Sequence, residues 1–162
     1  MKIEKFTKFS VAIKHLETSI LLFLENKDFF CSLTLSGAAE EILGEYAVRA
    51  KKVTMVDLIC ASLREDQLIE IPDKKLKFDY LNKTRNSVKH FNGKESEIIE
   101  CDPESESIIM LLRAIGNLYS HDETVTHNTP DFLQWVYENR RELLHGNHKL
   151  STQITKTSAI EL

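Results

Sequence analysis

Near its N-terminus the chain carries apolar side chains spaced as one stripe of a long helix. From residue 6 to residue 23 they recur at alternating steps of three and four, at Phe6, Phe9, Ile13, Leu16, Ile20 and Phe23. An α-helix completes a turn every 3.6 residues, so these positions share a single face. The pattern predicts a helix of about five turns whose apolar stripe must be covered by other helices.

Helix start signals recur along the rest of the chain. Further helices are predicted to begin after or near Asp28, Thr54, Asp73, Asp102 and Thr129, because such side chains cap the free N–H groups of a first turn. The helix opened by Asp73 is expected to end at Asn92-Gly93, and the last helix at Gly146. Five Gly and three Pro leave little material for the many tight turns of a β-sandwich. We therefore predict an all-α fold, an antiparallel bundle of five to six helices.

The length and composition bound the domain organisation. A chain of 162 residues with 42% hydrophobic content is the size of one domain with its own core. We expect a single helical domain over residues 1–146. Residues 147–162 hold Thr, Ser and Lys with scattered aliphatics and no aromatic residue, so a flexible C-terminal tail is predicted there.

The cysteines and the hydropathy indicate the compartment. Cys31, Cys60 and Cys101 are odd in number and match no metal-ligand spacing, so we expect plain thiols, and neither a metal nor another cofactor. No apolar run approaches the length of a membrane span, and we expect no membrane association. Together these features favour a cytoplasmic protein.

One stretch of the second helix is unusually slim. Ser36, Gly37, Ala38 and Ala39 would let another helix approach closely, either within the subunit or across a dimer, and we favour the first. Glu40 and Glu41 follow directly. They could pair with the basic face of another helix or simply be solvated.

A basic segment stands out in this acidic chain, whose net charge is -4. Between Asp79 and Glu95 there is no carboxylate. On a helical wheel one stripe faces inward, formed by Leu81, Thr84, Val88 and Phe91. The polar groups fan across the opposite side, at Asn82, Arg85, Asn86, Lys89 and His90. The segment is therefore a candidate anion site, although the negative net charge argues against broad capture of duplex DNA.

The spacing from Arg85 to His90 carries no weight alone, since Arg140 and His145 repeat it by chance with Glu142 between them. In its context, however, the run Arg85-Asn86-Ser87-Val88-Lys89-His90 resembles the motif of the HEPN superfamily (higher eukaryotes and prokaryotes nucleotide-binding). Members are compact helical domains with an arginine, a following polar residue and a histidine four to six residues on. The likeness extends over roughly residues 5–145 by helix count and order.

The resemblance implies a homodimer whose two motif helices form a metal-independent ribonuclease centre. His90 would move the proton of a ribose 2′-hydroxyl, Arg85 would stabilise charge on the phosphate, and Asn86 would orient one of them. Further contacts to single-stranded RNA or a nucleotide are expected from Asn82, Lys83, Lys89 and Lys94.

Two alternatives stay open for this segment. The same fold and dimer could serve without catalysis, as a helical interaction or nucleotide-binding module. Arg85, Lys89 and His90 could also merely solvate an exposed helix face. No phosphate-cradling glycine loop occurs in the chain, which disfavours an ATPase or a dinucleotide enzyme.

Overall fold

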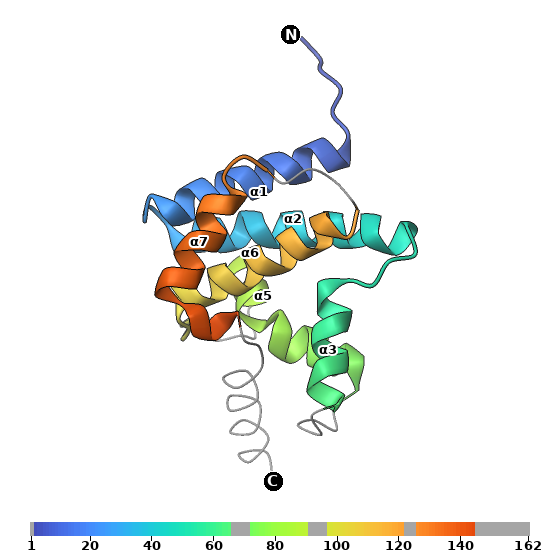
Figure 1. The fold of residues 1–162 in the computed structure, drawn as a ribbon, viewed down its shortest axis with the longest axis vertical. Helices are drawn as coiled ribbons and strands as arrows, with labels where there is room; N and C mark the ends of the chain where they lie inside the picture. Colours follow the sequence, from blue (N-terminus) through green and yellow to red (C-terminus); the bar gives the residue numbers. More distant parts are fainter. Residues whose placement is uncertain (1, 66–71, 91–96, 122–125, 145–162) are drawn as a thin grey trace.

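A computed structural model describes residues 2–65, 72–90, 97–121 and 126–144, and these parts contain helices and their connections but no strand. The predicted all-α helical bundle is confirmed. Its α-helices are α1 (Lys8–Leu24), α2 (Phe29–Arg49), α3 (Met55–Glu65), α4 (Asp73–Lys75), α5 (Lys83–Lys89), α6 (Pro103–Tyr119) and α7 (Thr129–Asn139) (Figure 1). A π-helical turn, η1 (Leu76–Leu81), and a 3-10 turn, η2 (Arg141–Leu143), complete them. Within the described ranges, no helix combines the length and apolarity needed to cross a bilayer.

Three of the predicted helix starts are capped as expected. The Asp28 carboxylate accepts a hydrogen bond from the Cys31 amide at 2.9 Å, which fixes the start of α2. Thr54 accepts from the Asp57 amide at 3.2 Å before α3. Asp102 accepts from the Ser105 amide at 3.2 Å and precedes Pro103 at the first position of α6. Each cap satisfies an N–H group that the first turn leaves without a partner.

Helices α1 and α2 form an antiparallel pair that approaches closely through small residues. Ser19 Oγ donates to the Ser32 carbonyl at 2.7 Å, and Ser32 Oγ donates to the Ser19 carbonyl at 3.0 Å. Both serines are fully buried. Each hydroxyl donates to a carbonyl of the other helix, so the crossing buries these polar groups without leaving them unpaired.

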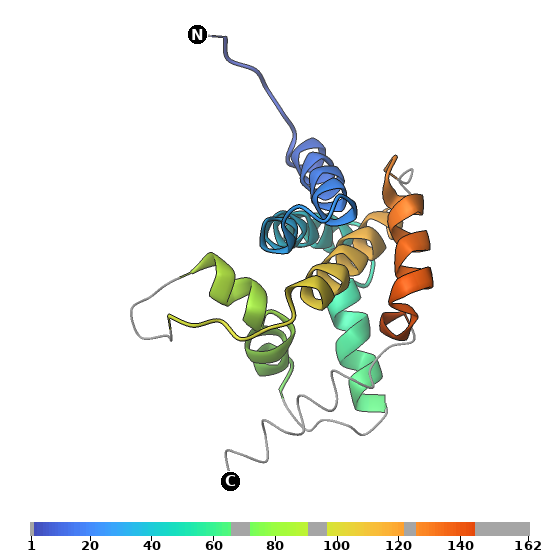
Figure 2. The same cartoon turned by 90° about the vertical axis from the view of Figure 1, so that its left-hand side faces the viewer.

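Helix α6 lies along α2 and runs in the same direction. Ser107 near its start donates to the Phe29 carbonyl, and Asn117 near its end donates to the Glu40 carbonyl. Because α2 and α6 are parallel, the chain between them must return to the end of the bundle at which α2 begins. The segment from α3 to α5 makes this return, and within it α5 lies beside α2 and η1. Figure 2 shows α5 and α7 on opposite sides of α6.

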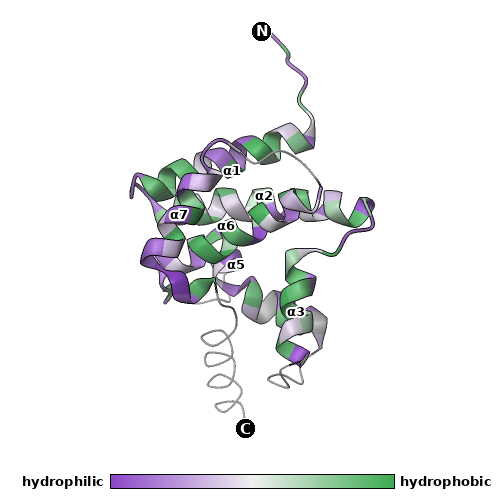
Figure 3. Cartoon of the chain, viewed as in Figure 1, coloured by the Kyte–Doolittle hydropathy of each residue, from purple (hydrophilic) through white to green (hydrophobic). Residues whose placement is uncertain are grey.

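Two hydrophobic clusters hold these helices. The larger lies between α1, α2, α6 and α7 and includes Leu16, Ile20, Phe23, Leu43, Ile108, Leu111, Phe132 and Val136. The smaller lies between α3 and η1 and consists of Cys60, Leu63, Leu76 and Leu81. In Figure 3 the apolar colour follows α3, whereas the end of α7 is hydrophilic.

The predicted helix from Asp73 to Asn92-Gly93 is broken, which corrects the sequence analysis. Its middle forms the wider turn η1, and Asn82 leaves helical geometry before α5 begins. Helix α5 ends at Lys89, since His90 is extended with φ -130° and ψ 137°. A π-helical turn holds more residues than an α-helical turn, so residues after it are rotated from the positions on a regular wheel. Asn92 and Gly93 lie outside the described residues.

The last helix is also shorter than predicted. It ends at Asn139 rather than Gly146, because Arg140 adopts non-helical backbone angles. The Arg140 guanidinium pairs with Glu104 and, at 3.6 Å, with Asp102. These contacts fasten the end of α7 to the start of α6. The predicted tail, residues 147–162, lies outside the described residues.

Candidate functional site

The Arg85 side chain lies against α2, and the prediction that it faces away from the protein is wrong. Only 12% of the side chain is exposed. Its aliphatic stem crosses Gly37, where an added Cβ would stand 2.7 Å from Arg85 Cδ. The slim stretch of α2 therefore receives a side chain of the same subunit, as we favoured from the sequence. The regular wheel placed Arg85 outward because it could not include the break at Asn82.

Two carboxylates of α2 bind the Arg85 guanidinium. Nη2 lies 2.9 Å from Glu41 Oε2, and Nη1 lies 3.4 Å from Glu40 Oε2. The side chain of Glu40 is 8% exposed and that of Glu41 is 63% exposed. The basic segment is free of acids along the sequence, but the fold supplies them from a helix more than forty residues away. Glu40 and Glu41 therefore pair with the basic face of another helix, which is one of the two roles predicted for them.

Arg113 on α6 supplies the second guanidinium of this site and was not among the predicted site residues. Its side chain is only 2% exposed. It donates to Glu40 Oε1 at 2.9 Å, to the Leu81 carbonyl at 3.0 Å and to Asn82 Oδ1 at 2.9 Å. One signal in the sequence could have identified it, because this arginine stands among the apolar residues that α6 buries. A buried charge of this kind requires a partner, and Glu40 is that partner.

We call the resulting contact between α2, α5 and α6 the polar seam; its members are Glu40, Asn82, Arg85, Arg113 and Asn117. Asn117 ties it to α3, since its Oδ1 accepts from the Met55 amide at 2.9 Å while its Nδ2 donates to the Glu40 carbonyl. With Glu41 included, two arginines face two glutamates, so the charges balance. Among the described residues, the buried Nε atoms of Arg85 and Arg113 lack a hydrogen-bond partner.

A further carboxyl of α6 lies beside α5. Burial raises the pKa of Glu106, while a side-chain hydrogen bond with Thr84 acts in the opposite direction. The like charge of Asp102 adds to the rise, and Arg113 opposes it. Glu106 therefore belongs to the environment of α5 although nothing in the basic segment itself points to it.

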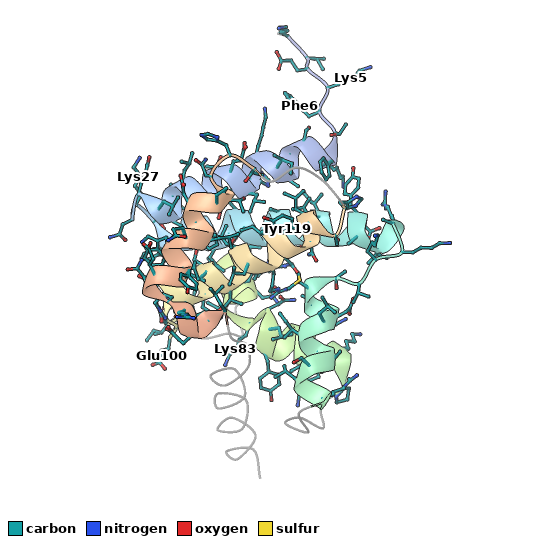
Figure 4. The ribbon with its side chains drawn as sticks, viewed as in Figure 1. Lys5, Phe6, Lys27, Lys83, Glu100 and Tyr119 are labelled. Carbon is teal, nitrogen blue, oxygen red and sulfur yellow. The ribbon has the colours of Figure 1, made fainter. Side chains whose placement is uncertain are left out.

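Of the remaining predicted site residues that the structure describes, some are partly buried near the polar seam and others are exposed to solvent. Asn82 was predicted to bind phosphate from an outward position, but it is half-buried and its side-chain oxygen is engaged by Arg113. Asn86 is also half-buried, whereas Lys89 and His90 are exposed as predicted. Lys83 projects outward at the start of α5 (Figure 4). Lys94 lies outside the described residues.

The predicted inward stripe is borne out only in part. Leu81 is buried, while Thr84 and Val88 are half-buried. Phe91, its last member, lies outside the described residues. Helix α5 thus rests on α2 through Arg85 rather than on a continuous apolar stripe.

The arrangement provides an exposed imidazole and an exposed ammonium at the end of α5. On the same helix, the guanidinium of Arg85 is already held by two carboxylates. An imidazole can transfer protons near neutral pH, and an ammonium attracts phosphate. Within the described part of the chain, no group of three or more His, Cys, Asp or Glu side chains could hold a metal ion.

No protein-family model matches this chain, and neither the curated proteins nor the solved structures yield a significant match.

Proposed function

We propose that this chain is an HEPN-like, RNA-directed protein that acts in the cytoplasm as a homodimer and cleaves single-stranded RNA without a metal. The observation that carries the proposal is that an arginine and a histidine of one short segment lie in different surroundings. Arg85 is fixed against α2, and His90, five residues later, is exposed. An HEPN-like centre needs this pair of a guanidinium and an imidazole on one short segment.

In this proposal His90 performs the proton transfers. It takes the proton of a ribose 2′-hydroxyl, and the 2′-oxygen attacks the adjacent phosphorus. The bond from phosphorus to the 5′-oxygen breaks, and that oxygen receives a proton from the protonated imidazole of the other copy. The products are a 2′,3′-cyclic phosphate and a 5′-hydroxyl. Lys89 adds positive field at the phosphates.

The geometry of α5 supports the second copy in this proposal. Residues five apart on a helix point about 140° away from each other, and His90 is displaced further by its extended backbone. Arg85 is directed at α2 while His90 is exposed at the end of the helix. A twofold neighbour that brings its own α5 to this end would supply the second imidazole.

A noncatalytic module is the second candidate, and the ion pairs of Arg85 favour it. Glu40 and Glu41 together neutralise the guanidinium, which weakens it as a stabiliser of a charged transition state. In that case the dimer would bind RNA or a nucleotide through Lys89 and His90 without cleaving it.

Cleavage of a labelled single-stranded RNA in EDTA separates the two candidates. We expect the purified chain to produce cyclic-phosphate ends, and His90→Ala to lose at least about 100-fold in rate, the usual contribution of a general base. His127→Ala is the matched control, because that histidine is exposed on a distant segment. Binding without cleavage would establish the second candidate. Equal activity in both variants would refute the assignment of His90.

The dimer has its own test. Light scattering at the concentration of the cleavage assay should give twice the mass of one 18.7 kDa chain. An active monomer would exclude a shared centre.

A further inference from the structure

We infer that the Glu41 carboxylate occupies the position at Arg85 that an RNA phosphate takes, so that Glu41 must be displaced for the RNA to bind. The inference rests on the proposed function and adds to it a residue that sets the affinity for phosphate.

The two carboxylates on Arg85 differ in how firmly they are held. Glu40 is 8% exposed, and its other oxygen binds the buried Arg113 at 2.9 Å. Moving it would leave Arg113 as an unpaired buried charge, which is costly. Glu41 is 63% exposed, and its ion pair among the described residues is the 2.9 Å contact with Arg85 Nη2. An ion pair with such an exposed partner is weak and exchanges readily with other anions.

Arg85 itself is preorganised to receive an anion. Its stem is seated on Gly37, and Nη1 faces the fixed carboxylate of Glu40, so the guanidinium has little freedom left to lose. The Nη2 group is then directed at the surface position that Glu41 holds. A phosphate oxygen is a good replacement there, because guanidinium groups bind phosphate and carboxylate with the same planar geometry.

The chemistry around this position favours the phosphodiester backbone of a single strand. Lys89 lies one helical turn from Arg85 on α5 and is exposed, so it can contact a neighbouring phosphate of the same strand. Glu41 opposes that contact by its negative charge. Its removal therefore strengthens binding in two ways, through the vacated Nη2 group and through the local field.

The test compares two substitutions that remove the same charge from the same helix. Glu41→Gln vacates Arg85, whereas Glu45→Gln, one turn further along α2, disrupts the exposed pair with Arg49 and leaves Arg85 paired. Binding of a fluorescent single-stranded RNA is followed by anisotropy at fixed salt. We expect E41Q to bind about two- to fivefold more tightly than E45Q, the range set by an exposed ion pair. Arg85→Lys keeps the positive charge but removes the planar pair of N–H donors of the guanidinium. Adding it to E41Q should abolish most of the gain in affinity for RNA.

The outcomes separate the inference from the proposed function. Equal tightening in E41Q and E45Q, with RNA bound by all forms, would overturn the role of Glu41 and leave RNA binding in place. No binding by wild type or E41Q, while thermal melts show both folded, would overturn the proposed function and this inference with it. Tighter binding by E41Q alone supports the role of Glu41 and the RNA binding that the proposed function requires, while the cleavage assay decides on catalysis.

Discussion

The α1–α2 contact and the polar seam cover two sides of the same helix by different means. Toward α1, α2 buries apolar side chains and two serines that satisfy each other. Toward α5 and α6, it buries Glu40 between two arginines. The first contact gains from the area removed from water and tolerates changes that keep its volume. The second depends on each partner being present, because any loss leaves a buried charge unpaired.

The largest difference between the two regions is expected at neighbouring positions of α6. Arg113→Met should lower the free energy of unfolding by about 3–5 kcal/mol, since it leaves Glu40 buried with a weakened set of partners. Leu111→Met introduces the same side chain into the apolar cluster and should cost less than about 1.5 kcal/mol. Urea denaturation measures both. Similar losses would mean that the seam is no more sensitive than the apolar core.

A smaller effect is expected where the seam meets the slim face of α2. Gly37→Ala places a methyl group 2.7 Å from Arg85 Cδ, and the stem is held by ion pairs at its end. Gly44→Ala is the control, because its nearest contact is 3.2 Å, to Asn117 Nδ2. Both substitutions raise helix propensity by a similar amount, so the difference between their free energies of unfolding reports the clash with Arg85. We expect Gly37→Ala to be less stable by about 1–2 kcal/mol in the same urea assay. A Gly37→Ala protein as stable as the control would show that Arg85 is free to move.

The smallest expected effect is a pH dependence of opposite sign at Glu106 in α6 and at Asp102, which caps the start of that helix. Burial raises the pKa of Glu106 above its ordinary 4.5, so the folded state holds that proton more tightly. Its stabilising contribution is complete below pH 4.5 and is lost as the pH rises through the folded value. Glu106→Gln should therefore be more stable than wild type at pH 7, with the difference shrinking toward pH 4.

Asp102 provides the matched contrast. Its hydrogen bond with Ser105, and then the charge of Arg140, lower its pKa from 3.8. Its contribution is present above pH 3.8 and is lost as the pH falls, so Asp102→Asn should lose stability at pH 7. Thermal melts from about pH 2 to pH 7 measure both variants, since the contribution of Asp102 is lost only below pH 3.8. The same pH trend in the two would contradict the assigned environments.

The apolar region could be predicted from the sequence because its signals are local. Of the predicted stripe, Leu16, Ile20 and Phe23 are buried, whereas Phe6 precedes α1 and is exposed. The caps at Asp28, Thr54 and Asp102 start helices as expected. Spacing along one helix decides which face is apolar, whatever covers it.

The polar seam could not be predicted in this way because it depends on contacts far apart in the chain. Arg85 meets carboxylates from α2, and Arg113 reaches both α2 and the residue before α5. The π-helical turn before Asn82 also rotated the motif relative to a regular wheel. Lys89 and His90 were predicted correctly as exposed, since they lie at the end of α5 beyond the seam.

The polar seam depends most directly on the ion pair between Glu40 and the buried Arg113, and a double-mutant cycle tests this pair. Glu40→Gln, Arg113→Met and the double variant are compared by urea denaturation. We expect the double variant to be less destabilised than the sum of the single changes by about 1–3 kcal/mol, because each single change strands a buried charge that the second removes. Additivity within about 0.5 kcal/mol would contradict the account.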